Sequence, residues 1–373
     1  MSSSCWMNTK LTVISTILAG LWVFLSLDSV FHDSKNPEIE MLPLDAATGP
    51  ESIAFDAKGE GPYTGISDGR ILKWLGKEHG WLEYAAVHAP HLLSKCRGSQ
   101  DPNLEHVCGR PLGLRFSDKT GELFVADAYL GLLVVGPDDK FATPIAKQAQ
   151  GVEFHVTNGL DIDPDSGAVY FTDSSMRFRR RQYISAVIAG DRTGRLMKYD
   201  PQSKEVQVLL DSLSFPNGVA LSQDGSHLLI VETITCRILR YWLRTPKAKT
   251  VEVIAQLPGF PDNIKRSPRG GFWVALHSKR TKLVERILSH PWLCDVLLNS
   301  SIDLQRVSSF VNRRSGKASA LRLSEAGQVL EVLEGFGGGI MRAISEVEER
   351  YGRLWIGSIA MPFVGIYNVT GPA

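Results

Sequence analysis

Carboxylate and carboxamide side chains recur at corresponding points of a repeated pattern in this sequence. At four openings, a short turn leads into a strand-like run that begins with an acidic or amide residue. The residues are Glu51, Asn158, Asn217 and the adjacent pair Asp262 and Asn263. Calcium takes about six to eight oxygen ligands from carboxylates, amide carbonyls, backbone and water. Two carboxylates and three amides would nearly neutralise the ion, so these five residues predict a calcium site.

The alternative for each residue alone is structural, because Asn-Gly and Asp-Asn are common turn pairs whose side chains cap their own backbone. The repetition favours a metal, since equivalent positions of a closed repeat array converge on its axis. Zinc is disfavoured, because no His or Cys cluster has the spacing of zinc ligands.

The repeat is clearest from Asn158 to Asp173, where an alternating strand, a turn and a second strand follow one another, with a third strand expected at Gly194 to Tyr199. Related stretches are Glu51 to Trp74, Leu112 to Asp127, Asn217 to Glu232, Asp262 to Leu276 and Ile344 to Ser358. Openings about 45 to 80 residues apart suit a propeller with insertions. We therefore predict an all-β fold, a six-bladed β-propeller with helical insertions over residues 45–370. A parallel α/β fold would need longer helical connections.

Composition agrees with one well-cored globular chain, since 43% of the 373 residues are apolar and 22% are charged. The formal net charge of +1 gives no electrostatic reason to expect a nucleic-acid partner. The basic run from Arg177 to Arg181 is interpreted as a solvated loop face. A small-molecule substrate is the expected partner.

An N-terminal segment, residues 1–30, precedes the predicted propeller. Its uncharged apolar run, Leu11 to Leu27, follows Lys10 and is succeeded by acidic residues. Its length lies between that of a signal-peptide core and a membrane-spanning helix. We expect a signal peptide or, by a small margin, an uncleaved membrane anchor, with the bulk of the chain lumenal. The expected location is the secretory pathway: the endoplasmic reticulum membrane or lumen, or the vacuole.

Two glycosylation sequons, at Asn299 and Asn368, accord with a lumenal location. Cys96 and Cys108 bracket a polar loop, and we predict a disulfide between them worth about 2 to 4 kcal/mol. Cys236 and Cys294 lie in apolar surroundings and are expected to be buried free thiols.

Two insertions interrupt the repeat, Arg177 to Asp191 and Lys282 to about Arg314. The second has apolar residues at roughly helical spacing, which predicts one or two amphipathic helices over a propeller face. Insertions of this kind either contribute to function or only cover the exposed edges of blades.

Several stretches resemble the strictosidine synthase-like family: Cys96 to Pro111, Asn158 to Asp200, Phe215 to Gly218 and Pro258 to Asn263. The resemblance covers nearly everything after about residue 45 and implies the same six-bladed propeller. That family in turn resembles calcium-dependent propeller hydrolases, the paraoxonases and lactonases.

The resemblance implies different chemistry from that of strictosidine synthase, which uses a glutamate in its last blade. Arg342 stands at that point in the stretch Gly338 to Arg342. A guanidinium cannot accept a proton at neutral pH, so we expect no strictosidine synthesis. Facing the channel, Arg342 could instead bind a substrate carboxylate or phosphate.

By the same resemblance, all five predicted ligands match the catalytic calcium site of the paraoxonases. The ion would polarise an ester or lactone carbonyl, with Asp262 as candidate general base or nucleophile. The paraoxonase histidine pair is replaced by Leu112 and Tyr129. Tyr129, His155 and His277 are the remaining candidate acid/base groups.

Two function classes follow: a calcium-dependent esterase or lactonase, which we favour, and a non-catalytic propeller that binds a metabolite or partner around a structural calcium. A catalytic ion would keep an open coordination position, whereas a structural ion would be enclosed by protein. Retained amine-aldehyde condensation is the least favoured.

Overall fold

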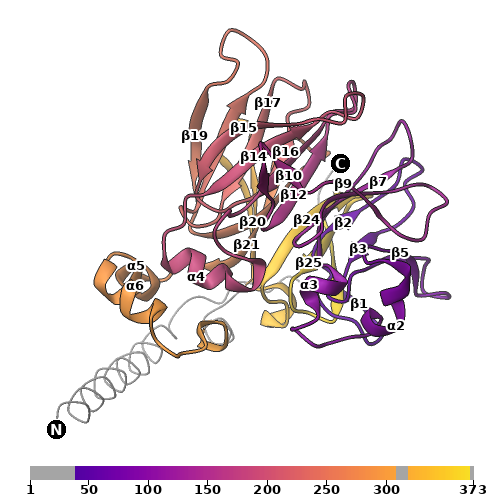
Figure 1. The fold of residues 1–373 in the computed structure, drawn as a ribbon, viewed down its shortest axis with the longest axis horizontal. Coiled ribbons are helices and arrows are strands. Elements are labelled where there is room, and N and C mark those ends of the chain that lie inside the picture. The colour runs from indigo at the N-terminus through magenta and orange to yellow at the C-terminus, as the bar shows by residue number, and fades with distance from the viewer. Residues whose placement is uncertain (1–37, 308–317, 370–373) are drawn as a thin grey trace.

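Residues 38–307 and 318–369 are described by the computed structural model, and they form six four-stranded antiparallel sheets (Figure 1). The first strand of each of the first five sheets, and β24 of the sixth, contact one another in a closed ring. The predicted all-β six-bladed propeller is therefore confirmed.

Each of the first five blades takes its four strands consecutively from the chain. The first two blades are β2 to β5 (Ile53–Ala54, Tyr63–Gly65, Arg70–Trp74, Trp81–Ala86) and β6 to β9 (Pro111–Phe116, Leu123–Asp127, Gly131–Val135, Thr143–Ala146). The third is β12 to β15 (Thr157–Ile162, Val169–Asp173, Gly194–Tyr199, Val206–Leu213), preceded by the small pair β10 and β11 (Gln148–Ala149, Val152–Glu153). The fourth and fifth are β16 to β19 (Pro216–Leu221, His227–Glu232, Arg237–Trp242, Val251–Gln256) and β20 to β23 (Gly259–Arg266, Phe272–Lys279, Ser319–Leu323, Val329–Glu334).

The sixth blade is built from both ends of the described chain. Its strands β24 to β26 (Ile344–Arg350, Arg353–Ser358, Phe363–Asn368) are completed by β1 (Glu40–Pro43), which pairs antiparallel with β26. Leu42 lies opposite Val364, and both are buried in one apolar cluster. The ring is therefore closed by a strand that lies before residue 45, where the propeller was predicted to begin.

The core lies between neighbouring blades. One apolar cluster joins Ile71 of the first blade to Leu114, Val125 and Leu133 of the second. The strand β17 is buried along its whole length because it has a blade on each side. Burial on both faces explains why this strand is a continuous apolar run rather than an alternating one.

Helices occur in the loops between strands. The third blade contains η2 (Arg180–Gln182) and α4 (Tyr183–Ile188), and the fifth contains α5 (Lys282–Leu288) and α6 (Pro291–Leu298). The Thr281 hydroxyl caps α5, and α6 begins with proline, which is favourable at a first helical position. Figure 1 shows α4, α5 and α6 close together at one end of the propeller. The predicted helices in the second insertion are confirmed.

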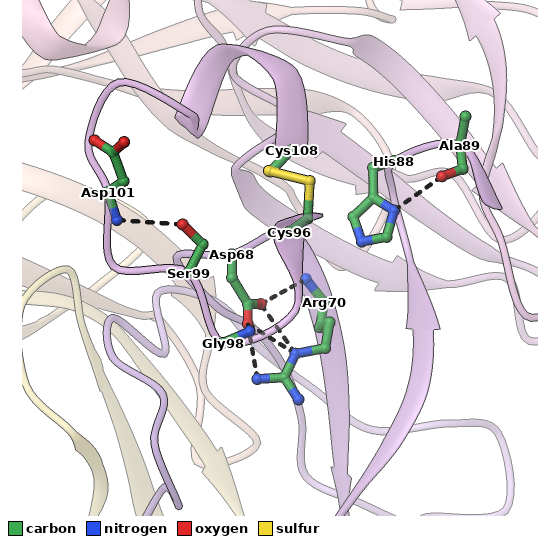
Figure 2. The surroundings of a disulfide bond; sticks show 9 residues. All are labelled: Asp68, Arg70, His88, Ala89, Cys96, Gly98, Ser99, Asp101 and Cys108. Carbon is green, nitrogen blue, oxygen red and sulfur yellow. Dashed lines mark hydrogen bonds and ion pairs between the residues drawn. A yellow bond between two sulfur atoms is a disulfide. The ribbon is translucent and has the colours of Figure 1, made fainter. Parts of the chain in front are cut away.

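The loop between the first two blades contains η1 (Pro90–Leu92), α2 (Leu93–Cys96) and α3 (Glu105–Cys108). The predicted disulfide joins the last residues of α2 and α3, with 5.4 Å between their Cα atoms (Figure 2). Nearby, Asp68 pairs with Arg70 and accepts a hydrogen bond from the Gly98 amide. As expected, Cys236 and Cys294 are buried and free.

The predicted apolar segment Leu11 to Leu27 lies outside the described residues. Among the residues that are described, no helix is long and apolar enough to cross a membrane. Asn299 and Asn368 are both exposed, and their glycosylation stays a prediction.

Candidate functional site at one end of the propeller axis

Four of the five predicted ligands, all except Glu51, lie on β-bulges at the beginnings of inner strands. The pairing register shifts between Thr157 and Leu160, between Pro216 and Val219, and between Pro261 and Ile264. Each interval contains one or two of the predicted ligands. A bulge leaves residues unpaired and re-aims their side chains. The shared irregularity therefore accounts for how these side chains leave the regular strand alternation.

Glycines beside these residues let the inner strands approach one another. A Cβ atom on Gly159 would lie 2.6 Å from the Cα atom of Gly218, and one on Gly218 would lie 2.7 Å from the Cα atom of Asn263. Real Cβ atoms essentially never come so close. The close packing of the inner strands therefore requires glycine at the second position of each Asn-Gly pair.

Four of the five predicted ligands, Glu51, Asn158, Asn217 and Asp262, line one cavity of about 590 Å³. All four side chains belong to buried residues. Asn263 is buried beside Asp262 but does not line this cavity. Side chains more than 200 residues apart in the sequence thus share one cavity, as convergence of repeat-equivalent positions requires.

Three oxygen atoms in this group have no hydrogen-bond partner: Oδ1 of Asn158, of Asn217 and of Asp262, all of them buried. Buried polar atoms are normally paired, so three unpaired acceptors in one place favour a bound cation. The orientation of Asn158 is fixed by its neighbours. The Ser174 hydroxyl donates to the Pro216 carbonyl at 2.8 Å and can only accept, at 3.0 Å, from the Asn158 amide nitrogen. The amide oxygen of Asn158 is therefore the free atom.

Asp262 is buried close to a second negative charge, that of Glu51. Burial, and after it the negative charge of Glu51, raise the pKa of Asp262 well above its ordinary value, while a hydrogen bond from Asn217 opposes this. In the described part of the chain, no three His, Cys, Asp or Glu side chains gather as a metal-binding group. A cation here would therefore depend on amide oxygens together with two carboxylates, a donor set that fits calcium.

Two arginines beside the cavity were not found from the sequence. Arg110 is 1% exposed, and its Nη2 donates to Oε2 of Glu51 at 2.9 Å. Arg180 lines the cavity, with Nη2 at 3.9 Å from the same Glu51 oxygen and Nη1 donating to Glu105 at 2.7 Å. Although burial acts to raise the pKa of Glu105, the charges of Arg180 and Arg110 lower it overall. The basic run was interpreted as a solvated loop face, and this is wrong for Arg180.

The candidate acid/base residues lie in different places. His277 lines the cavity, its two ring nitrogens are buried without partners, and burial lowers its pKa to about 4. Tyr129 does not line the cavity, and its hydroxyl donates to Glu105 at 2.9 Å. Arg342, expected to face the channel, is also absent from the lining, because the glycine-rich turn before it keeps its Nε near the Gly339 carbonyl. The sixth blade contributes Ile359 instead.

Helices α4, α5 and α6 form much of the remaining cavity wall, mostly with aliphatic side chains. Outside the lining, Glu346 lies on the inner strand β24 and accepts from the backbone of Ile53 at 2.6 Å, with Lys265 at 3.4 Å. Burial raises the pKa of Glu346 to about 7, although Lys265 opposes the shift. The cavity therefore has its carboxylate and amide groups on the propeller and a mostly aliphatic wall of helices.

The molecule is thus a six-bladed β-propeller with a ligand-sized cavity at one end of its axis. Residues 158–246 match the strictosidine synthase family, and residues 37–74 match the N-terminal region of strictosidine synthase-like proteins. Over 367 residues, the chain is 50% identical to "Protein STRICTOSIDINE SYNTHASE-LIKE 10" of Arabidopsis thaliana, covering 96% of this chain and 98% of that protein. The chain belongs to the strictosidine synthase-like family.

Among solved structures, a gluconolactonase from Xanthomonas campestris is similar, with a TM-score of 0.56 and 14% identity over 90% of this chain and 94% of that one. Regucalcin from Agrobacterium tumefaciens, described as a calcium-binding protein, gives a TM-score of 0.55 and 12% identity over 90% and 95% of the two chains. At these identities the likeness concerns the fold.

Proposed function

We propose that the protein is a calcium-dependent hydrolase of esters or lactones. The observation that carries this proposal is the set of three buried, unpartnered side-chain oxygens beside Glu51 in one cavity. The cavity volume of about 590 Å³ lies in the range of small-molecule sites. A gluconolactonase and a calcium-binding protein share the fold, which adds support.

Glu51, Asn158, Asn217 and Asp262 would hold the ion in this proposal. A bound calcium would polarise the substrate carbonyl and stabilise the oxyanion that forms on it. Arg110 holds the Glu51 carboxylate in place through one oxygen, Oε2. Ser174 does the same for the amide of Asn158. These two contacts fix donor orientation before any ligand arrives.

His277 is the proposed proton acceptor. Its pKa of about 4 keeps the ring neutral at pH 7, and neither ring nitrogen has a competing partner. Water attacking the carbonyl would give its proton to one of these nitrogens. Asp262 is then assigned to the ion rather than to proton transfer. Tyr129 is a poor acceptor at neutral pH, because burial, and then the charge of Glu105, raise its pKa far above neutrality.

A second candidate is a propeller that binds a metabolite without catalysis. It is favoured by one observation: neither His277 nitrogen has a hydrogen-bond partner to orient the ring as a base. Condensing activity of the strictosidine synthase kind is not proposed, because Glu51 and Asp262 are the only carboxylates among the described cavity-lining residues, and both are assigned to the ion.

We also propose that the chain resides in the secretory pathway. The disulfide between Cys96 and Cys108 accords with an oxidising compartment, and both sequon asparagines are exposed. A loss of mass on treating the plant-expressed protein with an N-glycosidase would support this location. An unmodified protein with both cysteines reduced would contradict it.

The test of hydrolysis is a panel of aryl esters and lactones, assayed with calcium and after chelation. The variant is Asp262→Asn, and the matched control is Asp118→Asn, which changes an exposed turn residue away from the cavity. We expect activity to be lost on chelation and in Asp262→Asn but kept in the control. Calcium that raises the melting temperature without supporting any hydrolysis would instead favour the binding propeller.

A further inference from the structure

The helices over the cavity present aliphatic side chains to it from three separate segments. The members that matter are Val187 and Ile188 of α4, Ile287 and Leu288 of α5, and Leu293 and Leu297 of α6, all of which line the cavity. Ile184 and Leu283 also line the cavity, so each helix contributes a pair four residues apart that shares one face: Ile184 and Ile188, Leu283 and Ile287, and Leu293 and Leu297. Charged residues of α5, such as Glu285, are exposed. The apolar faces therefore point inward together.

These apolar faces do not pack into the core of the propeller. None of the described hydrophobic clusters includes a residue of α4, α5 or α6. Helix α5 has no buried residue, α6 has only Cys294 and α4 only Ala186. A short amphipathic helix gains most of its stability by burying its apolar face. Here that face stays half-exposed, toward a cavity that can hold a ligand.

The two ends of the cavity have opposite character. The propeller end carries the charged and amide groups, Glu51, Asn217, Asp262 and Arg180, among apolar residues such as Phe260. The helical end is made mainly of Leu, Ile and Val, with the cations of Lys282 and Arg286 on α5. Polar groups brought against the aliphatic side chains of the helical end would lose hydrogen bonds to water without replacement, which weakens binding. A sugar, with a hydroxyl on nearly every carbon, and a peptide backbone are both poorly suited to that end.

We propose that the ligand of this cavity is an aliphatic acyl compound, with its hydrocarbon chain under α4, α5 and α6 and its oxygen-bearing head at the propeller end. The nature of the head, an ester or lactone, rests on the proposed function, whereas the chain site does not. Each methylene transferred from water to this wall adds about fourfold to affinity. The substrate class is therefore distinguished from the sugar lactones by the hydrocarbon chain.

Binding is measured without catalysis, by displacement of the fluorescent probe anilinonaphthalene sulfonate by straight-chain carboxylic acids of six to fourteen carbons in excess chelator. We expect affinity to rise about fourfold per methylene and then level off when the chain fills the cavity. Gluconate should not displace the probe. Affinity without chain-length dependence, or equal displacement by gluconate, would overturn the proposal.

Two substitutions locate the chain. Leu288→Asn should weaken binding of the ten-carbon acid about tenfold to a hundredfold, and Val187→Thr, which nearly preserves shape, about threefold to tenfold. The control Leu82→Asn changes a similarly apolar residue that is 55% exposed on β5 and does not line the cavity. Its affinity should not change. Melting temperatures confirm that each variant is folded, and equal losses in the control would refute the location.

The binding assay and the hydrolysis assay test the two proposals separately. Chain-dependent binding with no hydrolysis of any ester would retain this site and refute the proposed function. Hydrolysis that is indifferent to chain length, with no chain-dependent binding, would do the reverse.

Discussion

Burial of the His277 ring predicts a pH dependence of stability that one substitution removes. The ring's two nitrogens are shielded and unpaired, and burial lowers its pKa from 6.5 to about 4. At about 1.36 kcal/mol per pKa unit, protonating this ring in the folded state costs about 3 kcal/mol more than in the unfolded state. That is a large part of the 5 to 15 kcal/mol typical of a domain.

The direction follows from which state binds the proton more readily. Between pH 6.5 and pH 4 the unfolded chain is protonated at this residue and the folded chain is not, so stability falls as pH is lowered through that window. Above pH 6.5 both states are neutral, and His277 adds no pH dependence. His277→Gln keeps a polar side chain of similar size and cannot take up the proton.

The assay is urea unfolding of both proteins at several values between pH 7.5 and pH 4. The quantity of interest is the difference in unfolding free energy between wild type and His277→Gln, which cancels the titration of all other groups. We expect this difference to shift by about 3 kcal/mol against the wild type from pH 7.5 to pH 4. His79→Gln, at an exposed position, is the control. A difference that stays constant with pH would refute the burial argument.

Three further outcomes are expected. Gly218→Ala should lower the unfolding free energy by about 2 to 4 kcal/mol and abolish the rise in melting temperature with calcium, because its Cβ would lie 2.7 Å from the Cα atom of Asn263; an unchanged midpoint would contradict close packing of the strands. Cys96→Ser should cost about 2 to 4 kcal/mol in urea unfolding, and reductant should then have no further effect. Arg110→Met should cost up to about 3 to 5 kcal/mol without calcium, because Glu51 loses its hydrogen-bonded partner and keeps only Arg180 at 3.9 Å. Added calcium should recover part of the loss in melting temperature, and no recovery would count against Glu51 as a ligand.

The propeller was predictable because its repeat is local. Each strand, turn and strand unit, such as Asn158 to Asp173, carries its own alternation and turn residues, and six copies leave few alternative folds. The convergence of four predicted ligand residues on one cavity followed from the same repetition. The contribution of β1 was not found, because four residues with no turn of their own pair with a strand more than 300 residues away.

Arg110 and Arg180 were missed for a different reason. Charged residues are almost always exposed unless paired, so a sequence gives no local sign that Arg110 will be fully buried. Its burial depends on Glu51, 59 residues away in the sequence, which reaches it only when the first two blades have packed together. Arg342 was predicted to face the channel because of its position in a family motif. In the structure it does not line the cavity, and its Nε lies near the Gly339 carbonyl of the glycine-rich turn.

The pairing of β1 with β26 has a consequence for how the protein is made. Residues 40–43 leave the ribosome among the first of the propeller, yet their partners at residues 363–366 are among the last. Until then the ring is open, and both the first strand and the final blade present unpaired edges that can join other chains. A chain that stops before β26 would therefore be prone to aggregation even with five blades intact. Covering of these edges during synthesis thus depends on the last strand of the sheet.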